Sequence, residues 1–433
     1  MSTHGLLHWI AIGLLLAMPV RADPSCTGDC NGDHMVTVDE LLLAVNISLG
    51  TDNLSVCPVL DRNGDGVVSI DEILTAVGNA LQGCGGQTHA FVVTSDLSAV
   101  GSFGTIGLDP PRPVMPSSPQ RLIYRDAVAR VHEGLVYVIN RLFADNIQVL
   151  DPAANFATRF QCSTVNGTNP HDIAFVDDAK AYVTRFETSK LLIVNPSAQP
   201  NCKDFPLGTI DLSSLADADG NPDMDQMAIV DGRLYVSLER LNVNSVLRTP
   251  AENGAIAIVD TAADTLIGSI PLSGENPFSA TPGLTVRDGG IYVTEVGLFG
   301  VLDGGIERVD LQTQRAEGFL VTEQALGGDI TDFAIVSDHL IYAVVNYPNF
   351  SNALVAVDPT TCTPTICQSV TTLRQSAGFT FVDIELDDRG ELYVADRSLH
   401  APGVRVFRAA DGMELTSSPI DLVLPPVEIV FYP

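Results

Sequence analysis

The sequence is poor in basic residues. Its 23 lysines and arginines stand against 53 aspartates and glutamates, which gives a formal net charge of −30 over 433 residues. Phosphate groups are bound by clusters of cationic side chains, so this balance argues against nucleic-acid binding and against basic patches for an anionic lipid surface. Charged residues make up 18% of the chain and hydrophobic residues 45%, a composition that excludes disorder for most of its length.

Long apolar runs are also scarce. The single long run covers residues 6–20, about 15 residues, whereas a membrane-spanning helix needs roughly 20. It is followed by Val20-Arg21-Ala22, with small residues at the −3 and −1 cleavage positions. We therefore predict a signal peptide in residues 1–22, no membrane span, and a protein that is secreted, periplasmic or at the cell surface. A buried or spanning helix is the alternative.

Known hydrolase motifs are missing. The sequence has no Gly-x-Ser-x-Gly elbow, no His-Glu-x-x-His and no phosphate-binding glycine loop followed by lysine. It therefore assigns no catalytic residue, and whether the protein is an enzyme stays open.

Eight cysteines follow the predicted signal peptide, and an even number in an exported chain indicates disulfides. A zinc site would need two close pairs near one another, or nearby histidines, and the sequence offers neither. Four of the cysteines allow three pairings, of which we expect Cys26–Cys84 and Cys30–Cys57. We also expect a local Cys362–Cys367 bond and a Cys162–Cys202 bond between adjacent repeats.

Two acidic loops, DCNGDHMVTVDE at 29–40 and DRNGDGVVSIDE at 61–72, match the EF-hand pattern. That pattern places oxygen ligands at positions 1, 3, 5, 9 and 12 and a backbone carbonyl at position 7. The predicted calcium ligands are Asp29, Asn31, Asp33, Met35, Thr37 and Glu40 in the first loop and Asp61, Asn63, Asp65, Val67, Ser69 and Glu72 in the second.

Calcium is the predicted cofactor because clustered carboxylates repel one another without a cation, and hard oxygen ligands select Ca²⁺. An ordinary Asx-rich turn would explain one loop, but two copies offset by 32 residues favour metal. His34 occupies position 6 of the first loop, where a left-handed glycine is usual, so we expect this site to be weaker or slower.

Each loop is followed by a predicted helix. Two apolar stripes at helical spacing lie 32 residues apart, and we expect them to pack on each other: Leu41, Leu42, Val45 and Leu49, and Ile73, Leu74, Val77 and Leu81. The arrangement resembles the dockerin module, which implies a calcium-binding domain at 23–84 and a protein partner. Loop positions 10 and 11 are Val38-Asp39 and Ile70-Asp71, not the hydroxyl residues through which dockerins commonly read cohesins, so cohesin recognition is not implied.

After a short linker at 85–88, residues 89–433 repeat a short apolar strand that contains tyrosine. The tyrosines at 137, 182, 235, 292, 342 and 393 lie 45 to 57 residues apart, and most are flanked by two further strands. Four strands per repeat at this period predict a β-propeller, with seven blades as our count and six or eight as alternatives. Residues 427–432 would supply the missing inner strand of the first blade. The fold class is therefore mainly β, with a small N-terminal α-helical domain.

Residues 170–196 resemble a YVTN repeat, and residues 382–397 resemble an NHL repeat. The resemblance covers about residues 88–433 and implies architecture more than activity. Trp9 is the only tryptophan, so the tryptophan-dependent WD-repeat, kelch and quinoprotein motifs are absent.

Four aspartates, Asp172, Asp225, Asp332 and Asp383, each precede a repeat tyrosine by ten residues. This spacing predicts that they lie at the start of inner strands, around the mouth of the axial channel. They could form a carboxylate ring, with His171, that binds a cation or a polyol. We favour the simpler interpretation that each aspartate caps the turn entering its own blade.

Two functional hypotheses follow. The first is an exported calcium-binding protein whose propeller is a recognition scaffold for an unidentified ligand at the propeller face. The alternative is an extracellular hydrolase of lactones or glycosidic material that carries the dockerin-like part as a docking tag, since some propellers of similar type are metal-dependent lactonases.

Overall fold

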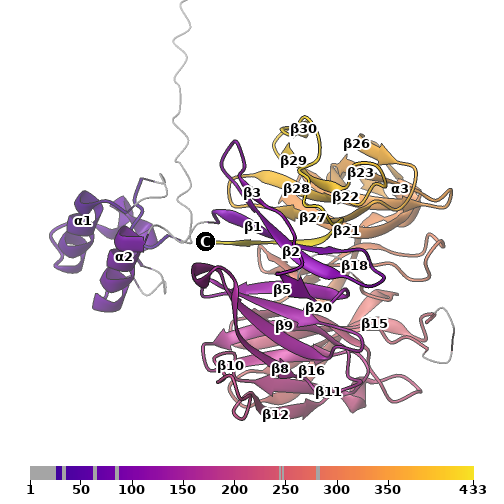
Figure 1. The fold of residues 1–433 in the computed structure, drawn as a ribbon, viewed down its shortest axis with the longest axis horizontal. Helices are drawn as coiled ribbons and strands as arrows, with labels where there is room; N and C mark the ends of the chain where they lie inside the picture. Colours follow the sequence, from indigo (N-terminus) through magenta and orange to yellow (C-terminus); the bar gives the residue numbers. More distant parts are fainter. Residues whose placement is uncertain are drawn as a thin grey trace, which may run out of the picture. The chain divides into compact units, whose positions relative to one another are not determined.

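The computed structural model describes residues 26–31, 36–61, 66–82, 87–242, 245, 248–278 and 283–433 (Figure 1). The chain divides into two units, Met1–Gly86 and Gln87–Pro433. The predicted signal peptide at 1–22 lies outside the described residues. Within the described ranges, no helix has the length and apolar character needed to cross a membrane.

The first unit is built on two helices, which each follow one of the acidic loops. They are α1 (Val38–Ser48) and α2 (Ile70–Gln82), with the short 3-10 turns η1 (Leu54–Val56) and η2 (Pro58–Leu60) between them. Helix α1 begins where the first loop ends, because the Glu40 carboxylate accepts the backbone N–H of Thr37 at 2.8 Å and its hydroxyl at 2.9 Å. Such bonds satisfy donors at a helix start that have no partner within the helix.

The face on which these helices pack differs in part from the prediction: Leu41 and Ile73 of the two stripes pack against the core, whereas other stripe residues lie on the surface. Leu42 and Leu49 are 58% and 73% exposed, and Val45 and Leu74 are also exposed. The core of the unit is formed by Ala44, Ile47, Cys57, Leu60, Val68 and Ala76. Ala44 and Ala76 are fully buried equivalents in the two helices, and small side chains there let the helices approach closely, which turns the larger leucines outward.

The second unit is a seven-bladed β-propeller, as predicted, and its described strands form seven antiparallel blade sheets and one separate two-stranded hairpin. Blades 1 and 2 contain β31 (Pro426–Tyr432), β1 (His89–Ser95), β2 (Gly101–Gly107), β3 (Val114–Met115) and β4 (Leu122–Ile123), then β5 (Ala127–His132), β6 (Leu135–Asn140), β7 (Asn146–Asp151) and β8 (Ala157–Ser163). Blades 3 and 4 contain β9 (Pro170–Asp177), β10 (Lys180–Arg185), β11 (Lys190–Val194) and β12 (Pro206–Asp211), then β13 (Met224–Val230), β14 (Arg233–Leu238), β15 (Asn253–Asp260) and β16 (Thr265–Glu275).

The remaining blades follow the same order. Blade 5 contains β17 (Thr285–Arg287), β18 (Gly290–Glu295), β19 (Gly305–Asp310) and β20 (Arg315–Thr322), and helix α3 (Glu323–Leu326) follows it. Blade 6 contains β21 (Asp329–Ser337), β22 (Leu340–Tyr347), β23 (Ser351–Val357) and β26 (Val370–Ser376), with the hairpin β24 (Cys362–Thr363) and β25 (Ile366–Cys367). Blade 7 contains β27 (Phe381–Leu386), β28 (Glu391–Asp396), β29 (Gly403–Arg408) and β30 (Met413–Glu414).

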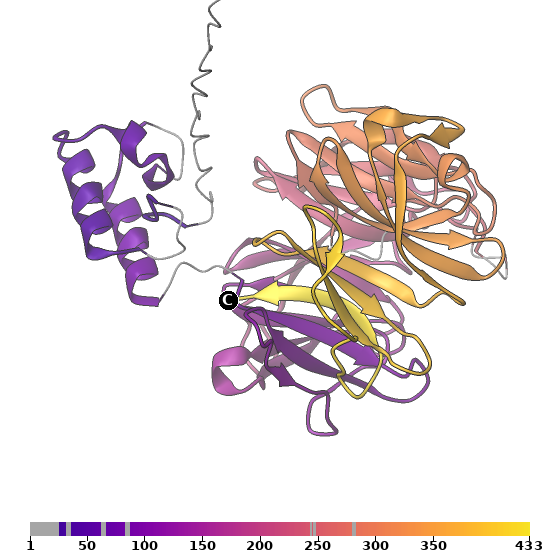
Figure 2. The same cartoon turned by 90° about the horizontal axis from the view of Figure 1, so that it is seen from above.

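The ring is closed by the two ends of the propeller sequence. The C-terminal strand β31 pairs antiparallel with β1, with Ile429 opposite Val92. Figure 2 shows this yellow strand beside the violet strands of blade 1. The predicted closing strand is therefore confirmed, and the pairing removes a free sheet edge from each terminus.

The recurrent tyrosine joins neighbouring blades. The hydroxyl of Tyr137 donates to the carbonyl of Pro196 at 3.0 Å, and that of Tyr342 donates to the carbonyl of Ala409 at 2.8 Å. In both cases the acceptor lies in the next blade along the chain. The tyrosine therefore recurs because its ring fills the space between blades while its hydroxyl reaches a partner.

Three predicted disulfides are confirmed: Cys30–Cys57, Cys162–Cys202 and Cys362–Cys367. The second connects β8 of blade 2 to the segment before β12 of blade 3, and the third closes the β24–β25 hairpin. Cys26 is also disulfide-bonded; Cys84, its predicted partner, lies outside the described residues.

Candidate functional site

The four predicted aspartates lie on innermost strands of their blades, on or beside the first residues. Asp172, Asp225, Asp332 and Asp383 belong to β9, β13, β21 and β27, and all four side chains are buried. Their predicted placement near the start of the inner strands is therefore confirmed, and of the four only Asp225 lines the pocket described below.

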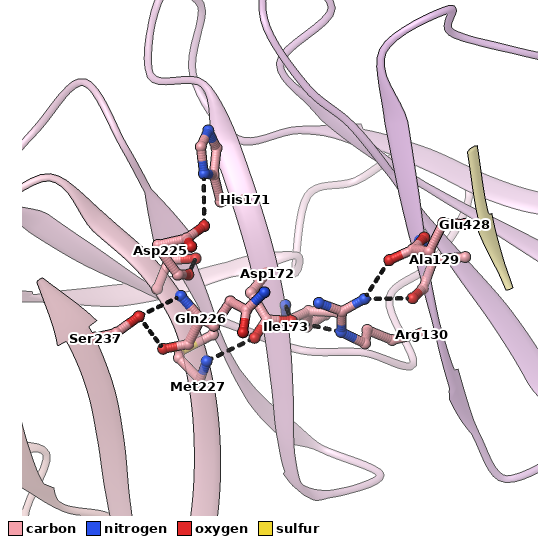
Figure 3. A network of polar contacts seen from close by, with 11 residues as sticks. Ala129, Arg130, His171, Asp172, Ile173, Asp225, Gln226, Met227, Ser237 and Glu428 are labelled. Atoms are coloured by element: carbon pink, nitrogen blue, oxygen red, sulfur yellow. Dashed lines mark hydrogen bonds and ion pairs between the residues drawn. The ribbon is translucent and has the colours of Figure 1, made fainter. Parts of the chain in front are cut away.

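Their bonding differs from both interpretations of the sequence. A carboxylate oxygen of Asp172 accepts the backbone N–H of Met227 at 2.7 Å, in the next blade (Figure 3). Asp332 accepts the N–H of Ile384 at 2.7 Å, and Asp383 accepts that of Ile429 at 2.9 Å, again from the next blade. Asp172 and Asp332 also accept the N–H of the following residue, at 2.7 and 2.8 Å. The turn-cap interpretation is therefore incomplete for these three aspartates, because a carboxylate on an inner strand also reaches the neighbouring inner strand. We call the bonds to the next blade the inter-blade clasps.

Glu428 on β31 makes a fourth clasp, which the sequence reading missed. Its carboxylate accepts the N–H of Ala129 at 2.5 Å and lies 3.0 Å from the guanidinium of Arg130 (Figure 3). The same guanidinium lies 2.7 Å from Asp172. Arg130 of blade 2 is therefore paired with acids from blades 1 and 3. The sequence signal that could have identified Glu428 is the similarity of Val427-Glu428-Ile to Val382-Asp383-Ile.

Burial and neighbouring negative charges raise the pKa values of several acids on the inner strands. Burial, and then the neighbouring charges of Asp332 and Glu428, raise the pKa values of Asp383 and Glu385 well above their ordinary range. Burial raises the pKa of Glu428 to about 7, and Arg130 opposes that rise. Among the described residues, the four aspartates do not bring three ligand atoms within 4.8 Å of one another. The structure therefore gives no geometric support to a cation-binding ring.

A pocket of about 180 Å³ opens beside these clasps, at the end of the channel where the inner strands begin. Its polar lining includes Arg130, Arg141, His171, Asp225, Glu239 and Glu428. We call it the channel-mouth pocket. His171 contacts Asp225 at 2.8 Å through Nδ1 and stacks on Phe186 with ring centroids 4.5 Å apart. His171 was predicted to lie beside the four aspartates, and in the structure it is paired with one of them, Asp225.

Glu239 is a buried acid of raised pKa in this pocket. Burial, followed by the charges of Asp225 and Asp223, raises the pKa of Glu239 well above its ordinary range, and its carboxyl group is hydrogen-bonded to Asp225. The pocket thus offers guanidinium groups, an imidazole and the hydrogen-bonded acids Asp225 and Glu239. These groups suit a small polar ligand, since drug-sized ligands occupy pockets of roughly 300–1,000 Å³.

The structure describes eight of the twelve predicted calcium-ligand residues. Asp33, Met35, Asn63 and Asp65 lie outside the described residues, as does His34. In the first loop the Glu40 carboxylate accepts the N–H groups of Cys30 at 2.9 Å and Asn31 at 3.2 Å. These bonds bring position 12 of the loop to positions 2 and 3, although Cys30 and Glu40 are ten residues apart in sequence.

The second loop has the same construction. Glu72 accepts the N–H of Ser69 at 2.8 Å and its hydroxyl at 3.0 Å, while Asp61 accepts the N–H of Gly66 at 2.8 Å. Gly66 has a φ of +83°, the left-handed conformation expected at position 6. Val67, whose carbonyl is the predicted ligand, has an exposed side chain.

No protein-family model matches the chain, and no curated protein matches its sequence. Solved structures share its fold. A functionally unknown protein from Desulfotomaculum acetoxidans has 12% identity and a TM-score of 0.50, over 80% of this chain and 99% of that one. A streptogramin B lyase has 12% identity and a TM-score of 0.48, over 72% and 91% of the two chains. At 12% identity the similarity to the Desulfotomaculum acetoxidans protein shows a shared fold and carries no functional assignment.

Proposed function

We propose that this chain is an exported calcium-binding protein in which a dockerin-like module with two Ca²⁺ sites is attached to a propeller that recognises a small polar ligand. The observation that carries the calcium assignment is the burial of loop carboxylates. Asp29 is 1% exposed and Glu72 is 5% exposed, whereas the only basic residue between Asp23 and Cys84 is Arg62.

Burying a carboxylate without a compensating cation is costly, because the charge loses its hydration. Two calcium ions would compensate these charges in a unit that has almost no basic side chains of its own. The oxygen-only donor set of both loops fits Ca²⁺, and Gly66 has the backbone conformation that such a loop requires at its sixth position. Ca²⁺ bound only to the folded state would stabilise the module by about 2.7 kcal/mol at a concentration one hundred times the Kd.

Differential scanning calorimetry with and without a chelator tests this assignment. Chelation should lower the melting temperature of the module and leave the propeller transition nearly unchanged. An identical thermal profile with and without the chelator would contradict calcium binding.

The exposed face of α1 supports a protein partner for the module. Leu42, Val45 and Leu49 form an apolar stripe on one side of the helix, and all three are exposed. Apolar side chains gathered on a surface are typical of interaction sites. Export is supported by the disulfides of both units, because such bonds persist in oxidising compartments.

For the propeller, the channel-mouth pocket favours recognition over glycoside hydrolysis. Two-carboxylate glycosidases hold their acids about 5–9.5 Å apart, with the scissile bond and in some cases a water between them. Asp225 and Glu239 instead share a hydrogen bond, which leaves no such space. A carboxylate ligand would pair with the guanidinium groups of Arg130 and Arg141. Screening small carboxylic acids and polyols by thermal shift, with Arg141→Ala as the comparison, tests this role.

A further inference from the structure

A second pocket on the propeller, of about 420 Å³, is lined by residues of blades 5 and 6 and of the segment that leads into blade 7. Its aromatic lining includes Phe299, Tyr347, Phe350 and Phe379. The three phenylalanines are each at least half exposed. We call it the aromatic pocket.

Two acceptor oxygens lie together at this pocket. Asp329 begins β21, and it is directly opposite Asn346 of β22 in the sheet register. Both residues line the pocket. Asp329 is 6% exposed; one of its oxygens accepts the N–H of Gly300 at 2.9 Å, while its buried Oδ1 accepts no hydrogen bond from the described residues.

Asn346 likewise has one side-chain atom that is hydrogen-bonded and one that is not, among the described residues. Its side-chain nitrogen donates to the hydroxyl of Thr331 at 3.1 Å, while its buried Oδ1 has no donor among the described residues. Unsatisfied buried acceptors cost free energy, so two of them on residues that line one pocket indicate a ligand that brings N–H or O–H groups.

The charge at the pocket is negative. Burial, and then the charge of Asp303, raises the pKa of Asp329 above its ordinary range, and burial together with the charges of Asp329 and Asp303 raises the pKa of Glu323 to about 8. A bound ammonium group would favour the ionised form of both acids. No lysine, arginine or histidine is among the described residues that line the pocket. Aromatic faces attract cations, and they do so more strongly where water is excluded.

We propose that the aromatic pocket binds a protonated primary amine on an aliphatic chain. The ammonium group would donate to Oδ1 of Asp329 and Oδ1 of Asn346, and the methylene groups would pack on the phenylalanine rings. A sugar fits less well, because its hydroxyl oxygens also need hydrogen-bond donors. Among the described lining side chains, the Tyr347 hydroxyl is the main donor that remains for them.

Two sources share this chemistry, a lysine side chain of a protein partner and a free alkylamine. The proposal is independent of the channel-mouth pocket, because the two pockets have no lining residue in common. Failure of one assignment therefore leaves the other intact.

The test is a ligand-observed NMR titration of the full chain with n-butylammonium and with Nα-acetyl-lysine methylamide. The neutral comparison ligands are 1-butanol and Nα-acetyl-norleucine methylamide. Such small probes should bind with a Kd on the order of millimolar, and the neutral ligands should bind at least about tenfold more weakly, because they lack the charge that pairs with Asp329. Tighter binding of the lysine probe would identify a peptide lysine as the source, and equal binding would identify free amines.

Asp329→Asn should weaken binding of both amines at least about tenfold, and Phe350→Ala should weaken it severalfold. The matched control is Asp338→Asn, which removes the same charge from an exposed turn at the other end of β21 and should leave the Kd unchanged. Equal effects of the two aspartate variants, equal binding of 1-butanol, or binding of glucose in preference to the amines would overturn the proposal. Because Asp338→Asn and Phe350→Ala change exposed side chains, a folded variant is available for comparison even if Asp329→Asn is unstable.

Discussion

The carboxylate of Glu428, on the C-terminal strand, lies 3.0 Å from the guanidinium of Arg130 on the inner strand of blade 2. This ion pair joins the strand that closes the propeller to the second blade of the ring. Arg130 continues the connection to Asp172 of blade 3 at 2.7 Å. Ring closure therefore depends on a polar network at the axis as well as on the pairing of β31 with β1.

The pH dependence of propeller stability follows from the acids of this network. The pKa of Glu428 rises from an ordinary value of 4.5 to about 7 in the folded state. Between these pH values the folded state keeps a proton that the unfolded state releases, so stability falls as pH rises through this range and stays lower above it. Glu428 alone accounts for a loss of about 3 kcal/mol, and Asp383 and Glu385 act in the same direction.

Guanidinium unfolding of the propeller at pH 5, 6, 7 and 8 measures this effect. We expect higher stability at pH 5 than at pH 8, and a shallower dependence in Glu428→Gln. A propeller that is more stable at pH 8 than at pH 5 would contradict the assignment.

Asp172→Ala should destabilise the propeller by about 3–5 kcal/mol, because it removes the partner of a buried guanidinium and the acceptor of the Met227 N–H. Asp172→Asn keeps an acceptor and should cost less. Equilibrium unfolding of both variants measures the difference. The control is Asp178→Ala in the same blade, where a mostly exposed carboxylate pairs with His132 and contributes at most about 1 kcal/mol; equal losses at the two positions would exclude the inter-blade clasp.

Substitutions on the two faces of helix α1 should differ in their effect on the stability of the module. Leu42→Ser changes an exposed side chain and should alter stability by no more than about 0.5 kcal/mol. Ala44→Leu adds bulk to a fully buried contact and should destabilise the module by about 1–3 kcal/mol. Thermal unfolding of the module measures both, and the reverse order would favour the packing predicted from the sequence.

His34→Gly should strengthen the first calcium site severalfold, because glycine adopts the left-handed conformation seen at the equivalent Gly66 without a steric penalty. The matched variant Gly66→His should weaken the second site. Calcium titration of the two variants compares them directly, and unchanged affinity in both would show that position 6 does not limit binding.

Much of the propeller could be predicted because its signals are local or periodic. The repeated tyrosines indicated where each blade lies in the sequence. The apolar run from Val427 to Tyr432 indicated a strand that pairs with the first blade. The role of Asp172 could not be predicted, since its donor Met227 lies 55 residues away and becomes adjacent only when the ring forms. Glu428 was missed because its blade takes its inner strand from the other end of the propeller sequence.

The helical module shows a different limit. Leu42 and Ala44 are both apolar, so periodicity alone could not decide which of them faces the second helix. Burial of Ala44 follows from its small size at a close contact, a three-dimensional property. The calcium loops, in contrast, were recognisable from ligand spacing alone, and that assignment stays a prediction.

The most direct test of the proposed function is isothermal titration of calcium into the full, chelator-treated chain. The account predicts two Ca²⁺ ions per chain, with Kd values of roughly 10⁻⁴–10⁻³ M, as in extracellular modules of this kind. Glu72→Gln should lose one of the two ions, while Asp338→Asn should keep both. Absence of saturable binding, or the same stoichiometry in Glu72→Gln as in the wild type, would contradict the account.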